Sequence, residues 1–152
     1  MTVVIAIENP DQPDIVALLG EADAWYATLY PAESNHLLDV RSLQQPGVSF
    51  LVARDAAGQL LGYGAVVDRG DYAEIKRMYV APAARGLKLG RRLLAALEAH
   101  AAGLGRRCLR LETGIHQPAA IGLYRATGYA GRGPFGDYAA DPLSLFMEKT
   151  LT

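Results

Sequence analysis

Residues 78–94 of the chain read MYVAPAARGLKLGRRLL. The apolar start, up to Val80, is typical of a strand, and the leucines at the end recur at helical spacing. Between them lies a short loop that carries Arg85, Gly86 and Lys88. The first backbone N–H groups of a helix have no intrahelical acceptor and carry partial positive charge. A strand, a basic loop and a helix in this order therefore predict a phosphate site.

The charge of this loop indicates a polyphosphate ligand. Four cations lie within eight residues, at Arg85, Lys88, Arg91 and Arg92. Two well-known nucleotide sites are excluded by the spacing. The Gly-Lys-Ser/Thr ending of a nucleoside triphosphate loop is missing, and the dinucleotide pattern G-x-G-x-x-G does not occur here.

The loop resembles motif A of the GNAT family of N-acetyltransferases, which is written Q/R-x-x-G-x-G/A. Arg85 and Gly90 match the two ends of that motif, and Lys88 replaces its central glycine. The resemblance implies that the loop amides bind the pyrophosphate of acetyl-CoA. Lys88 must then accept backbone angles that a glycine takes more easily, or turn its ammonium toward the phosphate.

A second stretch supports the same family. Residues 117–129 read QPAAIGLYRATGY and resemble motif B, commonly N-x-x-A-x-x-L-Y-x-x-x-G-F. Gln117 replaces the asparagine and offers the same amide chemistry. The resemblance spans roughly Val48 to Thr150 and implies an α/β protein with the GNAT acyl-CoA N-acyltransferase fold. That fold has a mixed, mostly antiparallel central sheet with helices on both faces.

The resemblance also implies which residues contact the cofactor. They come from the strand before the loop, from the loop itself and from motif B. They are Met78, Tyr79, Val80, Arg85, Gly86, Leu87, Lys88, Leu89, Gly90, Arg91, Gln117, Ala120 and Tyr124. Acetyl-CoA is the expected co-substrate. No metal is expected, because the three histidines are scattered without the spacing of metal ligands.

Acetyl transfer from a thioester to an amine requires that the amine lose a proton and that the leaving thiolate gain one. The family register places Glu74 at the position of a general base and Tyr124 at that of the general acid. Both assignments have structural alternatives. Glu74 could instead pair with Lys76 on the same strand, and Tyr124 could be a core tyrosine whose hydroxyl bonds to the backbone.

The sequence says less about the acceptor substrate than about the cofactor. Regions that shape the acceptor pocket in this family contain aromatic and acidic side chains, which suit a small primary amine. The candidates are Tyr26, Tyr30, His36, His116, Phe135 and Tyr138. Tyr30 has a core alternative, because it lies beside an apolar helix face, and each histidine could equally face solvent.

Three functional alternatives follow. We expect an enzyme that acetylates a small-molecule amine. A non-catalytic acyl-CoA-binding sensor, or an acetyltransferase that acts on a protein, would also carry these two motifs. The pair Glu74 and Tyr124 favours an enzyme, because a pure binding module needs neither proton-transfer group.

Composition limits the remaining classes. The chain has 152 residues, 51% of them hydrophobic, and a net charge of −1, which predicts a single domain over residues 1–152. No basic patch argues for nucleic acid, and no apolar run approaches the ~20 residues of a membrane helix. We expect a cytoplasmic protein, since the amino terminus lacks a signal-like stretch. Cys108 is the single cysteine and cannot form an internal disulfide.

The periodicity predicts an alternation of strands and helices. Strands are expected at residues 3–7, 48–54, 60–68, 72–80, 107–113 and 144–149. Helices are expected from Pro13 to Tyr30, at 35–43, from Leu89 to Gly105 and within residues 117–129. The apolar run Leu145 to Met147 would be a liability on an exposed sheet edge, which favours a homodimer paired through the last strand.

Overall fold

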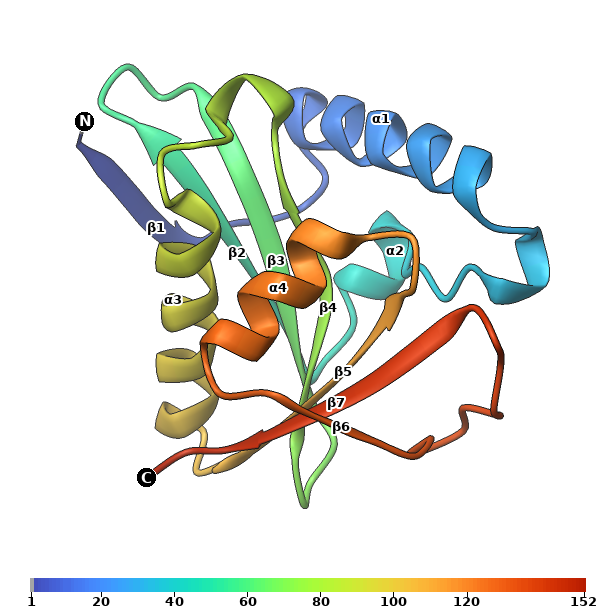
Figure 1. The fold of residues 1–152 in the computed structure, drawn as a ribbon. Coiled ribbons are helices and arrows are strands. Elements are labelled where there is room, and N and C mark those ends of the chain that lie inside the picture. Colours follow the sequence, from blue (N-terminus) through green and yellow to red (C-terminus); the bar gives the residue numbers. More distant parts are fainter. Residues whose placement is uncertain (1) are drawn as a thin grey trace.

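The computed structural model describes residues 2–152, and a seven-stranded sheet forms its centre (Figure 1). The strands are β1 (Val3–Ile7), β2 (Val48–Asp55), β3 (Leu60–Asp68), β4 (Ala73–Val80), β5 (Cys108–Gly114), β6 (Ala130–Arg132) and β7 (Ser144–Thr150). Their order across the sheet is β1-β2-β3-β4-β5-β7-β6. All neighbours are antiparallel except β4 and β5, which are parallel. The predicted mixed, mostly antiparallel sheet is confirmed.

Helices cover both faces of this sheet. The α-helices are α1 (Pro13–Leu29), α2 (Val40–Leu43), α3 (Leu89–Gly103) and α4 (Pro118–Ala126), and two 3-10 turns lie at Ala32–Ser34 and Pro82–Ala84. In Figure 1, α3 and α4 lie in front of the sheet, and α1 lies behind it. None of the helices formed by residues 2–152 is both long and apolar enough to cross a membrane.

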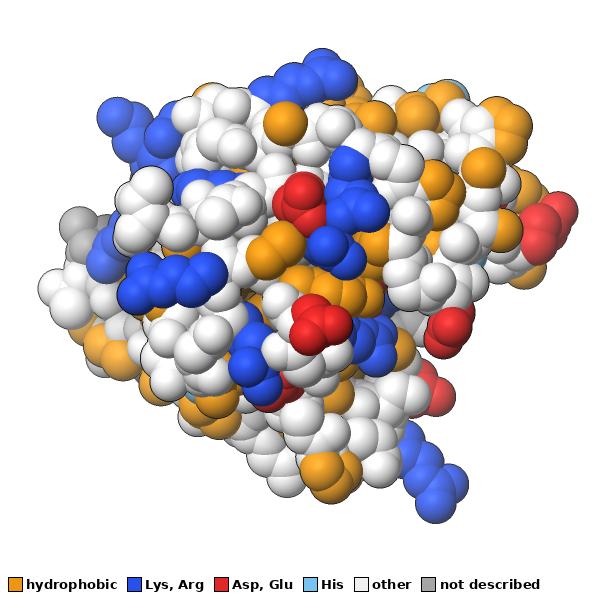
Figure 2. Space-filling model, turned by 90° about the horizontal axis from the view of Figure 1, so that it is seen from below, with side chains coloured by type: hydrophobic (Ala, Val, Ile, Leu, Met, Phe, Trp, Pro, Cys, Tyr) orange, Lys and Arg blue, Asp and Glu red, His pale blue; other side chains and the backbone are white. Residues whose placement is uncertain are grey.

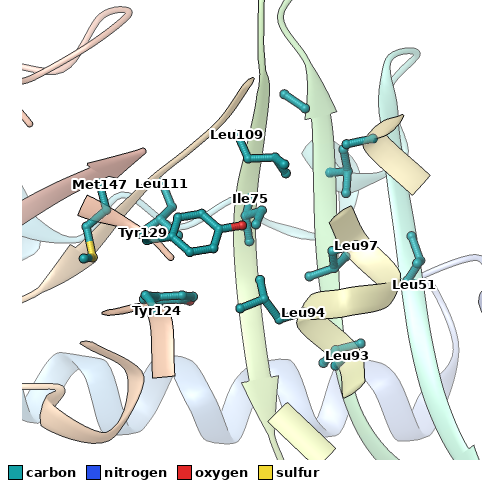
Figure 3. Close-up of a cluster of buried hydrophobic side chains, with 13 residues drawn as sticks. Leu51, Ile75, Leu93, Leu94, Leu97, Leu109, Leu111, Tyr124, Tyr129 and Met147 are labelled. Atoms are coloured by element: carbon teal, nitrogen blue, oxygen red, sulfur yellow. The ribbon is translucent and has the colours of Figure 1, made fainter. Parts of the chain in front are cut away.

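The core under α3 and α4 follows from the helical stripe seen in the sequence. Leu93, Leu97 and Ala101, spaced four residues apart, are fully buried against the sheet. They share one cluster with Ile75 of β4 and with apolar residues of β5 and β7 (Figure 3). Tyr124 of α4 closes the cluster on the β5 and β7 side. This packing holds the amino-terminal ends of α3 and α4 above the same part of the sheet.

The opposite face is packed by α1. Ile15, Leu19 and Ala22 lie on one stripe of that helix and are buried against β2 and β3. The same cluster contains Tyr26 and Tyr30, from the end of the helix. The carboxy-terminal end of α1 therefore delivers two aromatic side chains to the middle of the sheet.

Strands β4 and β5 separate shortly after they meet. They pair over only three residue pairs, from Ala73 opposite Leu109 to Ile75 opposite Leu111. Tyr30 occupies the space at the far end of β5, where a Cβ atom added to Gly114 would lie 2.0 Å from the tyrosine hydroxyl oxygen. That hydroxyl accepts a hydrogen bond of 3.0 Å from the backbone N–H of His116. The carboxyl ends of the two parallel strands are thus held apart, and a cleft opens between them.

A β-bulge interrupts β4 close to this separation. The pairing with β3 passes from Ala65 opposite Lys76 to Tyr63 opposite Tyr79, and Arg77 has a positive φ of 59°. Ile75 and Tyr79 would share one face of a regular strand, because they are four residues apart. Instead they belong to the cores on opposite faces of the sheet. The extra residue therefore turns the end of β4, so that Tyr79 packs on the opposite face of the sheet from Ile75.

The helix predicted at residues 35–43 is wrong for its first half. Residues 35–39 form neither helix nor strand, and α2 comprises only Val40–Leu43. Asp39 begins the helix, because its side chain accepts a hydrogen bond of 2.8 Å from the N–H of Ser42. The carbonyl of His36 accepts a hydrogen bond from Lys76, a tertiary contact that takes this part of the chain to β4.

The carboxy-terminal strand also differs from its prediction. β7 is an inner strand between β5 and β6, and Phe146 and Met147 are buried. The sequence analysis missed β6, which has only three residues and contains a glycine. β6 pairs with Phe146 to Glu148, so this part of β7 is not an exposed edge, and the homodimer stays a prediction.

The separation of β4 and β5 predicts a specific packing defect. In Gly114→Ala the new methyl group would overlap the Tyr30 side chain, which is buried and would have to shift. We expect a loss of roughly 1–3 kcal/mol in the free energy of unfolding, measured by chemical denaturation. Gly131→Ala in β6 is the control, because nothing lies within 4 Å of its added Cβ atom. Equal stability of the two variants would contradict this account of the separation.

Candidate active site

A cleft of about 570 Å³ lies where β4 and β5 have separated. Its walls are the end of β4, the loop that leads into α3, the first turn of α3 and the inner side of α4. The lining residues include Met78, Tyr79, Val80, Arg85, Gly86, Lys88, Leu89, Gly90, Arg91, Gln117, Ala120 and Tyr124. Most of the exposed lining is apolar, and the cations lie at the end formed by the loop.

The loop end of the cleft is an uncapped helix terminus. Lys88 is the N-cap residue of α3 and makes no side-chain capping bond. Its backbone is left-handed, with φ 57° and ψ 23°, so the conformation that a glycine takes more easily is the one found here. Gly86, two residues earlier, has a φ of 88°. The first N–H groups of α3 are therefore available to an anion in the cleft.

Arg85 is held at the same end by two aromatic rings. Its guanidinium lies 5.4 Å from the ring centre of Tyr79 and 5.8 Å from that of Trp25. Its Nε also donates to the carbonyl of Val80 over 3.3 Å. These contacts keep a cation beside the loop amides, since a guanidinium over an aromatic face is attracted by the ring quadrupole.

The opposite end of the cleft is formed by Tyr124 of α4. Its side chain is 7% exposed, and its hydroxyl faces the sulfur of Met78 across 4.0 Å. Burial raises the pKa of Tyr124 above its ordinary value of 10. The phenol is therefore protonated at neutral pH and has a proton to donate at the deep end of the cleft.

Two further cavities continue from this point. An inner pocket of about 70 Å³ shares Tyr26, Met78, Gln117 and Tyr124 with the cleft. An outer hollow of about 550 Å³ shares Asn35, His36, Leu37 and Lys76 with the inner pocket. The cleft, the inner pocket and the outer hollow thus form a row, and the inner pocket is its narrow middle.

Buried charges surround the outer hollow. Glu74 is 1% exposed, receives a hydrogen bond of 2.9 Å from Arg69 and receives another of 2.6 Å from the hydroxyl of Tyr138. Lys76 donates to Tyr138 and to the carbonyl of His36, each over 2.7 Å. Burial lowers the pKa of Lys76. Figure 2, which views the molecule from below, shows basic and acidic side chains mixed around apolar atoms, with no continuous patch of one sign on that face.

A second carboxylate, Glu112 of β5, lines the inner pocket. Its Oε2 accepts a hydrogen bond of 2.8 Å from the hydroxyl of Ser144 on β7. Burial raises the pKa of Glu112. The sequence analysis missed this residue, although its alternation with the apolar Leu111 placed it on the opposite face of β5 from the core. Its meeting with α4 depends on the separation of β4 and β5, for which the sequence offered no signal.

The structure brings most of the sequence-predicted residues together, with three exceptions. Glu74 lines the outer hollow, and neither the cleft nor the inner pocket. Leu87 points away from the cleft and is 50% exposed. Phe135 is buried among Tyr72, Tyr138 and Phe146 and lines none of the three cavities.

The other predicted acceptor residues are distributed along the row of cavities. Tyr26 lines the cleft and the inner pocket, Tyr30 lines the inner pocket, and His116 lines the cleft. His36 lines the inner pocket and the outer hollow, and Tyr138 lines the outer hollow. Within residues 2–152, no group of three or more His, Cys, Asp or Glu side chains is placed to hold a metal ion.

Comparison with known proteins identifies the family. The family model described as "Acetyltransferase (GNAT) family" matches residues 15–129. The chain belongs to the GNAT acetyltransferases. The predicted family and the predicted class of enzyme, an acyltransferase, are confirmed. A relative from Azospirillum brasilense named IAA acetyltransferase is 52% identical over 98% of both chains.

Two solved structures agree with this family. A Klebsiella pneumoniae protein assigned as an acyl-CoA N-acyltransferase is 41% identical, with a TM-score of 0.84 over 99% of both chains. A PaiA N-acetyltransferase from Thermoplasma acidophilum, solved in complex with coenzyme A, is 20% identical, with a TM-score of 0.77 over 99% of both chains. The second likeness concerns the GNAT fold alone.

The left-handed Lys88 predicts an unusual response to glycine. Lys88→Gly relieves a conformation that costs a non-glycine residue about 1 kcal/mol, so we expect the free energy of unfolding to stay equal or to rise. Arg91→Gly, in the regular first turn of α3, is the matched control and is expected to lose about 1 kcal/mol. Thermal and chemical unfolding measure both. A loss in Lys88→Gly as large as the control's would contradict the predicted relief of strain.

Proposed function

We propose that this GNAT protein transfers an acetyl group from acetyl-CoA to the amine of a small molecule, by direct attack in a ternary complex. The observation that carries the proposal is one continuous cleft that joins an uncapped helix terminus to a buried, protonated tyrosine. The first end suits a pyrophosphate, and the second suits the chemistry of a thioester. The coenzyme A complex of the PaiA N-acetyltransferase supports the same co-substrate.

In this proposal the cofactor extends along the cleft. Its pyrophosphate lies on the loop amides from Gly86 to Gly90, with Arg85 and Arg91 as neighbouring cations. The pantetheine arm passes between the end of β4 and α4, where Gln117 and Ala120 line the wall. The gap left by the separated strands is long and mostly apolar, which suits an extended arm with few charges.

The acetyl thioester then lies beside Tyr124 and Met78, at the mouth of the inner pocket. The acceptor nitrogen, once neutral, attacks the thioester carbonyl carbon and forms the C–N bond. The carbonyl electrons move to oxygen, return, and break the C–S bond. The thiolate leaves with that bond's electron pair, and the nitrogen loses its remaining extra proton. We assign oxyanion stabilisation to backbone N–H groups of β4 between Met78 and Val80, near the bulge.

Tyr124 is proposed to protonate the departing thiolate. A phenol with a raised pKa is a weaker acid than a phenol in water, which alone would disfavour the transfer. The thiolate, however, leaves into the same buried region, and desolvation raises its proton affinity too. Proton transfer from Tyr124 thus neutralises the buried thiolate and leaves a phenolate on the tyrosine. The amide nitrogen's released proton restores the tyrosine through solvent.

The acceptor is proposed to approach from the outer hollow, opposite the cofactor. The inner pocket of about 70 Å³ admits an amine and a few attached atoms, and the rest of the acceptor would occupy the wider hollow. Aromatic rings, the buried carboxylate of Glu74 and the half-buried one of Glu112 lie along this path and suit a cation, although Lys76 lines both cavities too. A small molecule fits these dimensions better than a peptide segment.

The direct test is isothermal titration with acetyl-CoA, followed by a thiol-release screen against small amines, amino acids and polyamines. Micromolar binding together with thiol release on one amine class would support the proposal. Binding without release on any amine would favour the acyl-CoA sensor. Release only with lysine-containing peptides would favour a protein acetyltransferase, and absence of binding would contradict the cofactor assignment.

The loop assignment predicts a selective loss of affinity. Gly90 lies in the first turn of α3, where an added Cβ atom would already lie 3.2 Å from Leu123 across the cleft. Gly90→Val should therefore narrow the cleft and weaken CoA binding at least about tenfold by titration calorimetry. Gly103→Val, at the other end of the helix and in open space, is the control. Unchanged affinity in Gly90→Val would contradict the placement of the cofactor.

The acid role predicts a separation of turnover from binding. Tyr124→Phe removes one hydroxyl and keeps the ring that fills the core, so kcat should fall by roughly 10². The dissociation constant for CoA should change by less than about threefold, because the hydroxyl faces Met78 and not the phosphate loop. A parallel loss of kcat, CoA affinity and thermal stability would instead assign Tyr124 a structural role.

A further inference from the structure

We propose that Glu112 of β5 takes the proton from the acceptor's ammonium group, and that it thereby selects a cationic primary amine. This inference rests on the proposed acetyl transfer and adds to it the residue that receives the amine. It differs from the expectation for Glu74, which the family register places on β4. The two carboxylates differ in position, in hydrogen-bond partners and in the charges around them.

Glu112 is in the cavity where the reacting groups would meet. It lines the inner pocket together with Tyr124 and Met78, the two residues that close the deep end of the cleft. Its charge is close enough to raise the pKa of the Tyr124 phenol, after the larger effect of burial. A nitrogen in this small pocket would therefore lie between the proton acceptor on one side and the thioester on the other.

The hydrogen bonds of Glu112 orient it and leave one oxygen free. Ser144 donates to Oε2 over 2.8 Å, from the neighbouring strand β7. Across residues 2–152, no donor is bonded to Oε1. Oε1 can thus accept a proton from a ligand, while the serine holds the carboxyl group in place.

Glu74 is arranged differently. Both of its oxygens already accept hydrogen bonds, Oε1 from Arg69 and Oε2 from Tyr138, and Lys76 lies 3.8 Å from Oε2. It faces the outer hollow, and so lies outside the pocket that reaches Tyr124. An acceptor ammonium could therefore bind Glu74 only by displacing one of these partners.

The charges around Glu112 agree with a proton acceptor for a cation. The neighbouring groups are Glu74, Lys76 and Arg77 on β4, His36 in the segment before α2, Ser144 on β7 and Tyr124 on α4. Burial is the largest influence and raises the pKa of Glu112, which makes the carboxylate a stronger base than a glutamate in water. The acceptor's ammonium would replace some of the lost solvation when it enters.

Glu112 and Tyr124 act on different protons of the proposed reaction. The ammonium gives one proton to Oε1 of Glu112, and the neutral amine that results attacks the thioester carbonyl carbon. The C–N bond forms, the C–S bond breaks, and the thiolate takes its proton from Tyr124. The nitrogen then loses its second extra proton, which restores the Tyr124 phenol through solvent. The carboxylic acid of Glu112 returns its proton to solvent through the outer hollow after the acetylated product leaves.

The test measures thiol release by Glu112→Gln at several pH values, with the best amine found for the wild-type protein. At about pH 7 we expect kcat to fall by roughly 10² or more. At about pH 9.5, where a larger fraction of the amine is already neutral, the deficit relative to wild type should shrink to about tenfold or less. Glu98→Gln is the matched control, because Glu98 is also partly buried, also accepts from a hydroxyl, and lies outside all three cavities. Its kcat should match that of the wild type.

Two more variants complete the experiment. Glu112→Asp retains a carboxylate and should keep the wild-type shape of the pH profile at a reduced rate, which covers the case in which Glu112→Gln is unstable. Glu74→Gln leaves Arg69 and Lys76 with fewer partners, so it should lower stability and reduce the rate by a factor that does not change with pH.

The outcomes separate the two proposals. A rate deficit that shrinks with pH in Glu74→Gln, and none in Glu112→Gln, would overturn the assignment of Glu112 and leave acetyl transfer intact. A deficit in Glu112→Gln that is constant with pH would also overturn it and indicate a structural role. Failure of the wild-type protein to release thiol with any amine would overturn the proposed function and this inference together.

Discussion

The separation of β4 and β5 is the constraint on which the rest of the site depends. The two strands hydrogen-bond over three residue pairs, and Tyr30 then occupies the space that a side chain at residue 114 would need. Parallel strands that stay paired would close the sheet and bury the inner side of α4 against β4. Because they diverge, the amino-terminal ends of α3 and α4 face a common cleft. Gly114 on β5 leaves a space without a side chain, and the Tyr30 side chain from the end of α1 fills it.

The bulge in β4 adds a second consequence. It lets one strand contribute Ile75 to the core under α3 and Tyr79 to the core under α1, although the two residues are four positions apart. Lys76 and Arg77, which flank the extra residue, both line the inner pocket. A strained backbone at Arg77 is thus compensated by packing on both faces. The same irregular segment borders the cleft at the point where the thioester is proposed to react.

Electrostatics divide the row of cavities into two functional ends. The loop end is cationic and is made mostly of backbone N–H groups and arginine side chains, which suit a phosphate that stays in contact with water. The proposed acceptor end holds the buried Glu74, the half-buried Glu112 and Lys76, where each charge is costly unless it is partnered. Burial raises the pKa of Tyr124 and of Glu112 and lowers that of Lys76. The proposed proton-transfer groups therefore lie where solvent is scarce, and the proposed phosphate-binding groups lie where it is not.

Local sequence was sufficient for the family, the cofactor loop and most of the elements. The loop from Arg85 to Gly90 and the helix that follows are specified by residues adjacent in the chain, so the sequence predicts a helix amino terminus beside cations. The α3 stripe and the motif B helix are likewise local patterns. The inner pocket is different, because it is made by Tyr30, Lys76, Glu112 and Tyr124, which come from four separate segments. Their meeting depends on the bulge, on the separation of β4 and β5 and on the segment before α2, each of which results from long-range packing. The sequence by itself therefore determined the helix terminus and the cations at which we propose that a phosphate binds. Only the tertiary structure decided which carboxylate lines the inner pocket with Tyr124, because a strand's periodicity shows which residues share a face and not which cavity that face meets.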